Sequence, residues 1–128
     1  MTNQTIDTTT PVGTWTASST IAGEASPYRT RFDFNPDHTL TAYGPPGPDG
    51  EPAFMGTGHW FTRPDGTFVH HVTHPVPDGN GGQIGAVYAI QSGSVSGDRL
   101  ESAGSAVMHT AGGGVADPVE VTLSAERV

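Results

Sequence analysis

Four of the six histidines lie within sixteen positions of one another, at His59, His70, His71 and His74. Imidazole is the side chain best suited to proton transfer near neutral pH, and it is also a common metal ligand. If residues 67–74 form a strand, His70 and His74 share a face but lie about 13 Å apart, too far to bind one ion together. His59 and His71 can pair across two strands, yet two imidazoles without a third ligand make a weak site. We therefore expect no metal site.

His70 is the strongest candidate for chemistry. It is predicted to lie inside the fold at mid-height, opposite Trp60, where Gln91 and Tyr28 can supply polar contacts. One hypothesis is that His70 moves a proton or polarises a carbonyl group while Gln91 or Tyr28 orients it. The alternative is a buried histidine whose hydrogen bond to a neighbouring hydroxyl is purely structural. The sequence leaves both interpretations open.

The composition removes several other kinds of chemistry. The chain has no cysteine, and all five of its cations are arginines, so disulfides, thiolate nucleophiles and lysine Schiff bases are impossible. A formal net charge of −8 argues against nucleic acids and anionic membrane surfaces as partners. No catalytic carboxylate pair, nucleophile elbow or phosphate-binding loop is recognised. We expect no bound cofactor.

The elements that must position these residues are strands. Helical periodicity is nearly absent, whereas short alternating stretches separated by Gly and Pro recur along the chain. The alternation is clearest near the C-terminus, where Val121, Leu123 and Ala125 alternate with polar residues. The expected strands are residues 12–19, 28–34, 39–43, 57–63, 67–74, 84–95, 100–110 and 119–128.

The connections between these strands alternate in length. The short turns cover residues 35–38, 63–66 and 96–99, and the long Gly/Pro-rich loops cover residues 18–27, 44–56, 75–83 and 111–118. Strands that run up and down place successive connections at opposite ends. The chain is therefore predicted to be all-β, a single eight-stranded antiparallel up-and-down barrel with a closed floor and an open mouth. The barrel domain is expected over residues 11–128, after a disordered tail of residues 1–10.

Turn geometry also predicts which side chains face the lumen. The turns pair Phe34 with Leu40 and Val95 with Leu100. By analogy they favour an inward Trp60 and His70, but a β-bulge in the strands at 57–63 and 67–74 would exchange the two faces. On the strands at 57–63 and 67–74, the residues assigned to the outer face are His59, Phe61, Val69 and His71. Many inward positions on the strands at 84–95 and 100–110 are small: Ala89, Gly93, Ser102, Gly104 and Ala106. Either they leave a cavity for one small ligand, or bulky groups from the other wall fill the space.

Gly13-Thr14-Trp15, at the start of the first strand, resembles the G-x-W signature of lipocalins and the wider calycin group. Barrels of that group carry a basic residue near the end of the barrel that packs over the Trp, and Arg127 is placed for this structural role at the floor. The resemblance implies a compact calycin-like bacterial barrel, and barrels of this shape include cyclases and isomerases of natural-product pathways. Residues 1–10 show no signal-peptide pattern, and we expect a cytoplasmic protein.

We expect a hydrophobic small molecule to bind in the lumen. The catalytic candidates are His70, Gln91 and Tyr28, and the ligand-binding candidates are Phe32, Trp60, His74 and Met108, with Phe54 and Met55 above them as a lid or as a tucked-in loop tip. The favoured function is a cofactor-independent cyclase or isomerase acting on a polyketide-like intermediate of secondary metabolism. A non-catalytic binding or carrier protein is the alternative. A third hypothesis is a homodimer that forms through the outer face around Phe61 and Val69 while the lumen is full.

Overall fold

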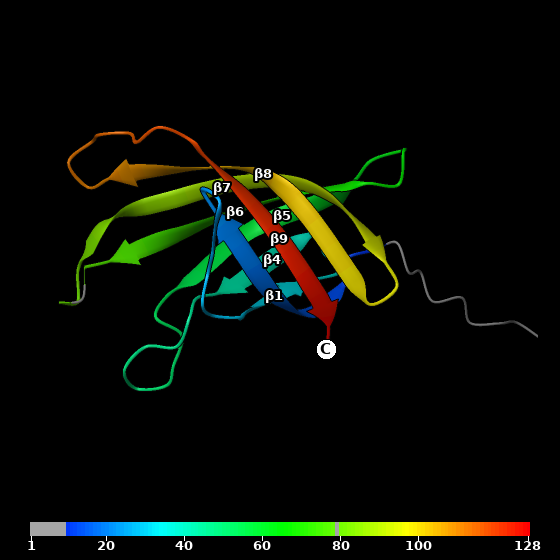
Figure 1. The fold of residues 1–128 in the computed structure, drawn as a ribbon, viewed down its shortest axis with the longest axis horizontal. Coiled ribbons are helices and arrows are strands. Elements are labelled where there is room, and N and C mark those ends of the chain that lie inside the picture. The colour runs from blue at the N-terminus through cyan, green and yellow to red at the C-terminus, as the bar shows by residue number, and fades with distance from the viewer. Residues whose placement is uncertain (1–9, 79) are drawn as a thin grey trace, which may run out of the picture.

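The structure is a computed structural model, and it describes residues 10–78 and 80–128. Across these residues every regular element is a strand, and no helix has the length and apolar composition needed to cross a membrane. The predicted tail falls outside the described residues except for Thr10, so its disorder stays a prediction. The strands are β1 (Gly13–Ile21), β2 (Glu24–Ala25), β3 (Thr30–Phe34), β4 (Thr39–Tyr43), β5 (Met55–Thr62), β6 (Phe68–Pro77), β7 (Gln83–Ser96), β8 (Arg99–Thr110) and β9 (Val119–Arg127) (Figure 1).

The strands form one closed sheet. From β3 to β9 each strand pairs antiparallel with the next in sequence, β1 pairs with β3, and β1 also pairs with β9 from Trp15↔Arg127 to Ile21↔Val121. The two-residue β2, which the sequence did not predict, pairs only with the end of β1. The predicted all-β, eight-stranded up-and-down barrel is confirmed, with β2 as one extra strand.

Tight turns occupy one end of the barrel. His38, Gly66 and Gly97 take left-handed backbone conformations there, with φ of 71°, 87° and 61°. Within two of the turns, Asp37 and Asp65 each accept hydrogen bonds from the backbone and hydroxyl of the threonine two residues later, which fixes the turn. The predicted pairings of Phe34 with Leu40, Trp60 with His70 and Val95 with Leu100 follow from these turns and are confirmed.

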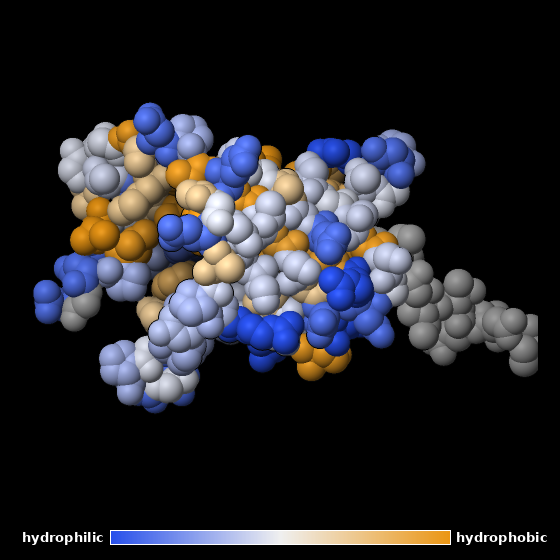
Figure 2. Space-filling view, in the orientation of Figure 1, coloured by the Kyte–Doolittle hydropathy of each residue, from blue (hydrophilic) through white to orange (hydrophobic). Residues whose placement is uncertain are grey.

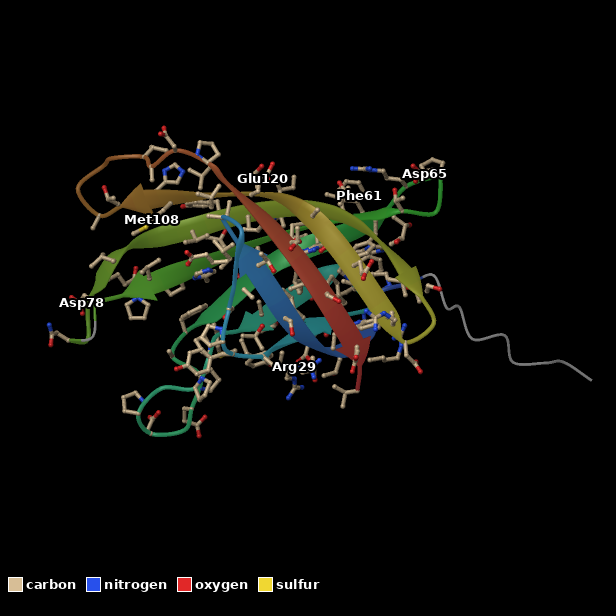
Figure 3. All side chains as sticks on the ribbon, viewed as in Figure 1. Arg29, Phe61, Asp65, Asp78, Met108 and Glu120 are labelled. Atoms are coloured by element: carbon tan, nitrogen blue, oxygen red, sulfur yellow. The ribbon has the colours of Figure 1, made fainter. Side chains whose placement is uncertain are left out.

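The long connections gather at the opposite end. The loops before β5, β7 and β9 project to the left in Figure 1, whereas the turns after β5 and β7 lie to the right. In Figure 3, Met108 and Asp78 lie toward the long-loop end, and Asp65 marks the other end. The predicted alternation of loop length therefore sorts the connections into a floor and a mouth.

The floor is filled with large side chains. Trp15, Phe34, Leu40, Phe68 and Leu100 are almost completely buried. The guanidinium of Arg127 lies 4.3 Å from the centre of the Trp15 ring, as the resemblance implied. Its Nη1 donates to the Val12 carbonyl at 2.7 Å, so the first and last strands are joined at the floor. A ligand cannot enter from this end.

One predicted surface position is covered. Val69 alternates with the inward-facing Phe68 and His70, which places it on the outer face as predicted, but only 5% of it is exposed. It lies between Phe61 and Ser92 in the sheet, and Arg63 reaches over to donate a hydrogen bond to the Ser92 hydroxyl at 2.8 Å. The expectation that Val69 is open to a partner is therefore wrong.

The small inward residues have two different roles. At Gly93 and Gly104, an added Cβ would overlap the backbone carbonyl oxygens of Glu101 and Ile90 on the neighbouring strand. These glycines therefore permit close approach between β7 and β8. Ala89 and Ala106 are different, because their short side chains border an open space.

Candidate functional site

A cavity of about 300 Å³ lies inside the barrel on the mouth side of the floor. Figure 2 shows apolar surface around a hollow at the long-loop end of the molecule. Most of its lining is apolar, with side chains from β3, β6, β7, β8 and β9, among them Phe32, Val72, Val87, Ala89, Ala106 and Val121. The predicted hollow exists because Ala89 and Ala106, on β7 and β8, leave space on the inner side of the sheet. Phe32 and Met108, both predicted ligand contacts, border it.

The loop between β8 and β9 folds back over the mouth. The Ala116 amide donates to the Met108 carbonyl at 2.9 Å, and His109 forms an isolated bridge with Val115. This return places Ala116 and Asp117 on the cavity wall. Neither residue is among the ligand contacts predicted from the sequence; the available signal was the apolar pair Val115-Ala116 in an otherwise glycine-rich loop.

His74 is the histidine that borders the cavity. Its Nδ1 lies 2.9 Å from the Pro75 carbonyl, which can only accept, so in the neutral ring Nδ1 carries the hydrogen and Nε2 has the free lone pair. The Phe54 ring stacks on His74 with a centroid distance of 4.3 Å. Phe54 therefore packs behind His74 and does not line the cavity.

Two other predicted residues lie away from the ligand space. Tyr28 is 53% exposed, in the segment between β2 and β3, because β3 begins only at Thr30. The predicted inward orientation of Tyr28 is wrong. Met55 is also 53% exposed and starts β5 rather than covering the mouth.

Trp60 belongs to the floor. It is buried, its Nε1 donates to the Asn35 carbonyl at 2.9 Å, and its ring lies 4.5 Å from that of His38. Both partners come from the tight turn between β3 and β4. Trp60 faces inward and pairs with His70 as predicted, but it stabilises the closed end and does not border the cavity.

His70 lies beneath the cavity in an aromatic cluster. Its ring stacks on Phe68 and meets Phe32 and Phe34 nearly edge to face, with centroid distances of 5.6 to 6.4 Å. Burial, with a smaller contribution from His71, lowers the pKa of His70 from 6.5 to about 4. His70 is therefore neutral at physiological pH, and it does not touch the cavity.

A hydrogen-bonded chain connects His70 to the cavity. His70 Nε2 lies 3.0 Å from the Ser102 hydroxyl, which lies 2.7 Å from Gln91 Oε1. All three side chains are buried, and Gln91 borders the cavity. The predicted proximity of His70 and Gln91 is present, but Ser102 links them. Ser102 was predicted to face inward only as a small residue, and no role was predicted for its hydroxyl.

The remaining histidine pair lies on the outer surface. The rings of His59 and His71 pair across β5 and β6 with centroids 5.3 Å apart. Within residues 10–78 and 80–128 no group of three His, Cys, Asp or Glu side chains is arranged to bind a metal ion. The pair is also outside the barrel, and we assign it no role at the cavity.

The geometry defines a class of protein: a β-barrel with a sealed floor and an apolar cavity beneath long loops. The Trp15–Arg127 contact makes it consistent with a calycin-like barrel. Comparison with protein families, with curated proteins and with solved structures finds no match for this chain. The case for a function therefore depends on the residues of the cavity.

Proposed function

We propose that this protein binds a small, predominantly apolar molecule in the barrel cavity. The observation that carries the proposal is the cavity itself, which combines a volume of about 300 Å³ with a largely aliphatic wall and a mouth at the long-loop end. Ligand pockets of proteins begin at about this size and are mostly apolar with a few polar groups. Here the polar groups are few and include Gln91, His74 and Asp117.

The charge around the cavity further restricts the chemical class of the ligand. Asp117 is a carboxylate on the wall, and the chain carries a net charge of −8. An anionic ligand would approach against this field and lose its hydration inside an apolar space. The supported ligand is therefore not an anion, and most of its surface is buried against Val, Ala and Phe side chains.

Filling the cavity tests this proposal. The fluorescent probe N-phenyl-1-naphthylamine gains emission in apolar sites, and we expect the wild-type protein to bind it. Ala106→Phe places a ring in the cavity, because Ala106 is buried on its wall, and should weaken binding at least about ten-fold. Ala103→Phe is the matched control, because Ala103 lies on the same strand but is exposed outside. Equal binding by both variants would contradict a ligand site in the barrel.

A second candidate function is cofactor-independent cyclisation or isomerisation of the bound molecule. The observation that favours it is His74, which borders the cavity and keeps Nε2 free to accept a proton. Tyr28 lies outside the cavity, and His70 is neutral and sealed off from it. In this candidate function His74 therefore transfers the proton. Confinement of a reactive conformer would supply the remainder of the acceleration. The calycin-like resemblance, with its natural-product cyclases, supports the same class of reaction by analogy only.

Turnover separates an enzyme from a carrier. A suitable probe is cyclohex-3-en-1-one, whose isomerisation to the conjugated ketone moves one proton between carbons and is followed by ultraviolet absorbance. A catalytic role predicts turnover above the buffer rate, with loss of at least about ten-fold in His74→Gln and unchanged affinity for the naphthylamine probe. Binding of the ketone without turnover supports a carrier.

A further inference from the structure

The chain His70–Ser102–Gln91 spans β6, β8 and β7 and ends at the cavity. Its first member is sealed: His70 Nδ1 has no hydrogen-bond partner in the described part of the chain and no contact with solvent. Its last member is open: Gln91 borders the cavity, and the amide nitrogen Nε2 has no protein partner among the described residues. The direction of the hydrogen bonds therefore decides which group Gln91 presents to a ligand.

Two directions are possible, because the Ser102 hydroxyl has a single hydrogen. In the first, His70 Nε2–H donates to Ser102, which donates to Gln91 Oε1, and the Gln91 NH₂ group faces the cavity. In the second, the histidine tautomer and the glutamine amide are both reversed, and the Gln91 carbonyl oxygen faces the cavity. The two cases differ in what is left unpaired on the buried face of His70.

Two observations favour the first direction. The contact between Ser102 and Gln91 is 2.7 Å, which is the usual length of an O–H···O bond and short for N–H···O. In addition, the first direction leaves His70 Nδ1 as a bare lone pair, whereas the second would leave an N–H without an acceptor. Buried N–H groups without partners are rarer in proteins than unpaired acceptors.

We propose that Gln91 is the specificity-determining residue of the cavity, and that its NH₂ group selects apolar ligands carrying a hydrogen-bond acceptor such as a ketone, aldehyde or ester carbonyl. This inference depends on the proposed ligand-binding function. The donor is built into a wall that is otherwise largely apolar there, next to the cross-strand pair Ala89 and Ala106. A ligand without an acceptor would displace water from the amide and leave it unpaired, which lowers its affinity.

Ser102 and His70 act in this scheme as positioning residues. A glutamine amide free in a cavity can rotate by half a turn and present either its oxygen or its nitrogen. The Ser102 hydroxyl donates a hydrogen bond to Gln91 Oε1 and so fixes the amide. The N–H at Nε2 of the neutral His70 ring donates to Ser102 and so fixes the direction of that hydroxyl. The preference for an acceptor is therefore set two side chains away from the ligand.

Isosteric ligands test the inference. Acetophenone and α-methylstyrene have the same shape, with C=O in one where the other has C=CH₂. The hydrocarbon is more hydrophobic, so the two affinities differ for reasons unrelated to Gln91. We therefore compare the ratio of the ketone affinity to the hydrocarbon affinity between each variant and the wild-type protein, measured by NMR titration. In Gln91→Leu the ratio should shift about three- to ten-fold against the ketone. Ser102→Ala should shift it in the same direction by less, without an equal loss of affinity for the hydrocarbon.

Gln83→Leu is the matched control, because Gln83 begins the same strand and is exposed outside the cavity. It should keep the wild-type ratio. A second measurement needs no variant and so does not depend on whether the variants fold. In the wild-type protein, the side-chain NH₂ signals of Gln91 should shift downfield with acetophenone and much less with α-methylstyrene. If both ligands bind but neither the ratio nor these signals respond as described, the inference is wrong while ligand binding stands. If neither ligand nor the fluorescent probe binds, the proposed function itself fails.

Discussion

At the scale of single residues, His70 shows how burial changes the use of a side chain. In the sequence it is the natural candidate for proton transfer. In the barrel it is 1% exposed, surrounded by three phenylalanine rings and bonded to the Ser102 hydroxyl. Its depressed pKa removes the proton it would need as an acid at physiological pH. Its contribution is to orient Ser102 and, through it, Gln91.

This burial predicts an acid-sensitive stability. The unfolded chain binds a proton at His70 below about pH 6.5, but the folded barrel does so only below about pH 4. The free energy of unfolding therefore falls as pH drops through this window, by about 3 kcal/mol from His70 alone. His70→Phe should lack this part of the pH dependence, measured by urea unfolding at pH 7, 5.5 and 4. Identical pH profiles for the wild-type protein and His70→Phe would contradict a buried neutral His70.

At the scale of elements, the inward glycines and alanines of β7 and β8 have different structural roles. In the sequence they look alike, as small residues at inward positions. Gly104 is required because β8 passes so close to β7 that any Cβ would meet the Ile90 carbonyl and the Gln91 Cα. Ala106, two positions later, has room beside it, and that room is the cavity. Strand geometry and ligand space are thus set by different residues of β8.

Replacing Gly104 should therefore affect stability. Gly104→Ala forces β7 and β8 apart and is expected to lower the free energy of unfolding by about 1–3 kcal/mol, measured from urea midpoints. Ser105→Ala, at the exposed neighbouring position, should change it by less than about 0.5 kcal/mol. A Gly104→Ala protein as stable as the wild type would show that the strands are not in tight contact there.

At the scale of the whole molecule, the first and last strands must meet for a cavity to exist. β1 and β9 pair over seven positions, and Arg127 adds a latch at the floor through the Trp15 ring and the carbonyls of Val12 and Gly97. This latch closes the barrel at the end opposite the mouth. The cavity therefore depends on a contact between residues more than a hundred positions apart.

Removing the latch should weaken the whole barrel. Arg127→Ala loses the cation–π contact and charged hydrogen bonds to partly buried carbonyls, and we expect the free energy of unfolding to fall by about 2–4 kcal/mol. Arg127→Lys should recover only part of this free energy of unfolding, because an ammonium group cannot span the same acceptors. Arg99→Ala, whose ion pairs with Glu101 and Glu126 are exposed, should cost less than about 1 kcal/mol. Equal losses at both positions, by thermal or urea unfolding, would contradict the latch.

Association between copies also belongs to this scale. Phe61, Tyr88 and Ile90 are each about half exposed on the outer face of β5 and β7, although Val69, which pairs with Phe61, is covered. The homodimer, the third hypothesis drawn from the sequence, stays a prediction. That hypothesis also held that side chains fill the lumen, and the cavity inside the barrel does not agree with this part of it.

The sequence by itself determined the barrel and its two ends. Alternation with a period of two is a local property of each strand, and turn residues such as Asp65-Gly66 set the register of the hairpin that contains them. These local rules predicted the eight strand positions and the separation of short turns from long loops. They only favoured the inward facing of Trp60 and His70, because a bulge would have reversed it. The Trp15–Arg127 contact followed from the resemblance and from the position of the two strand ends.

Only the tertiary structure decided what the lumen holds. Whether a space is open depends on side chains from all eight strands at once, and on how closely β7 approaches β8 at Gly104. His70 and Ser102 are thirty-two positions apart, so no local pattern indicates their hydrogen bond. The exposure of Tyr28 was decided by where β3 begins, and the place of Asp117 on the wall by how the last loop folds back. These are non-local properties of a closed sheet, and strand periodicity carries no information about them.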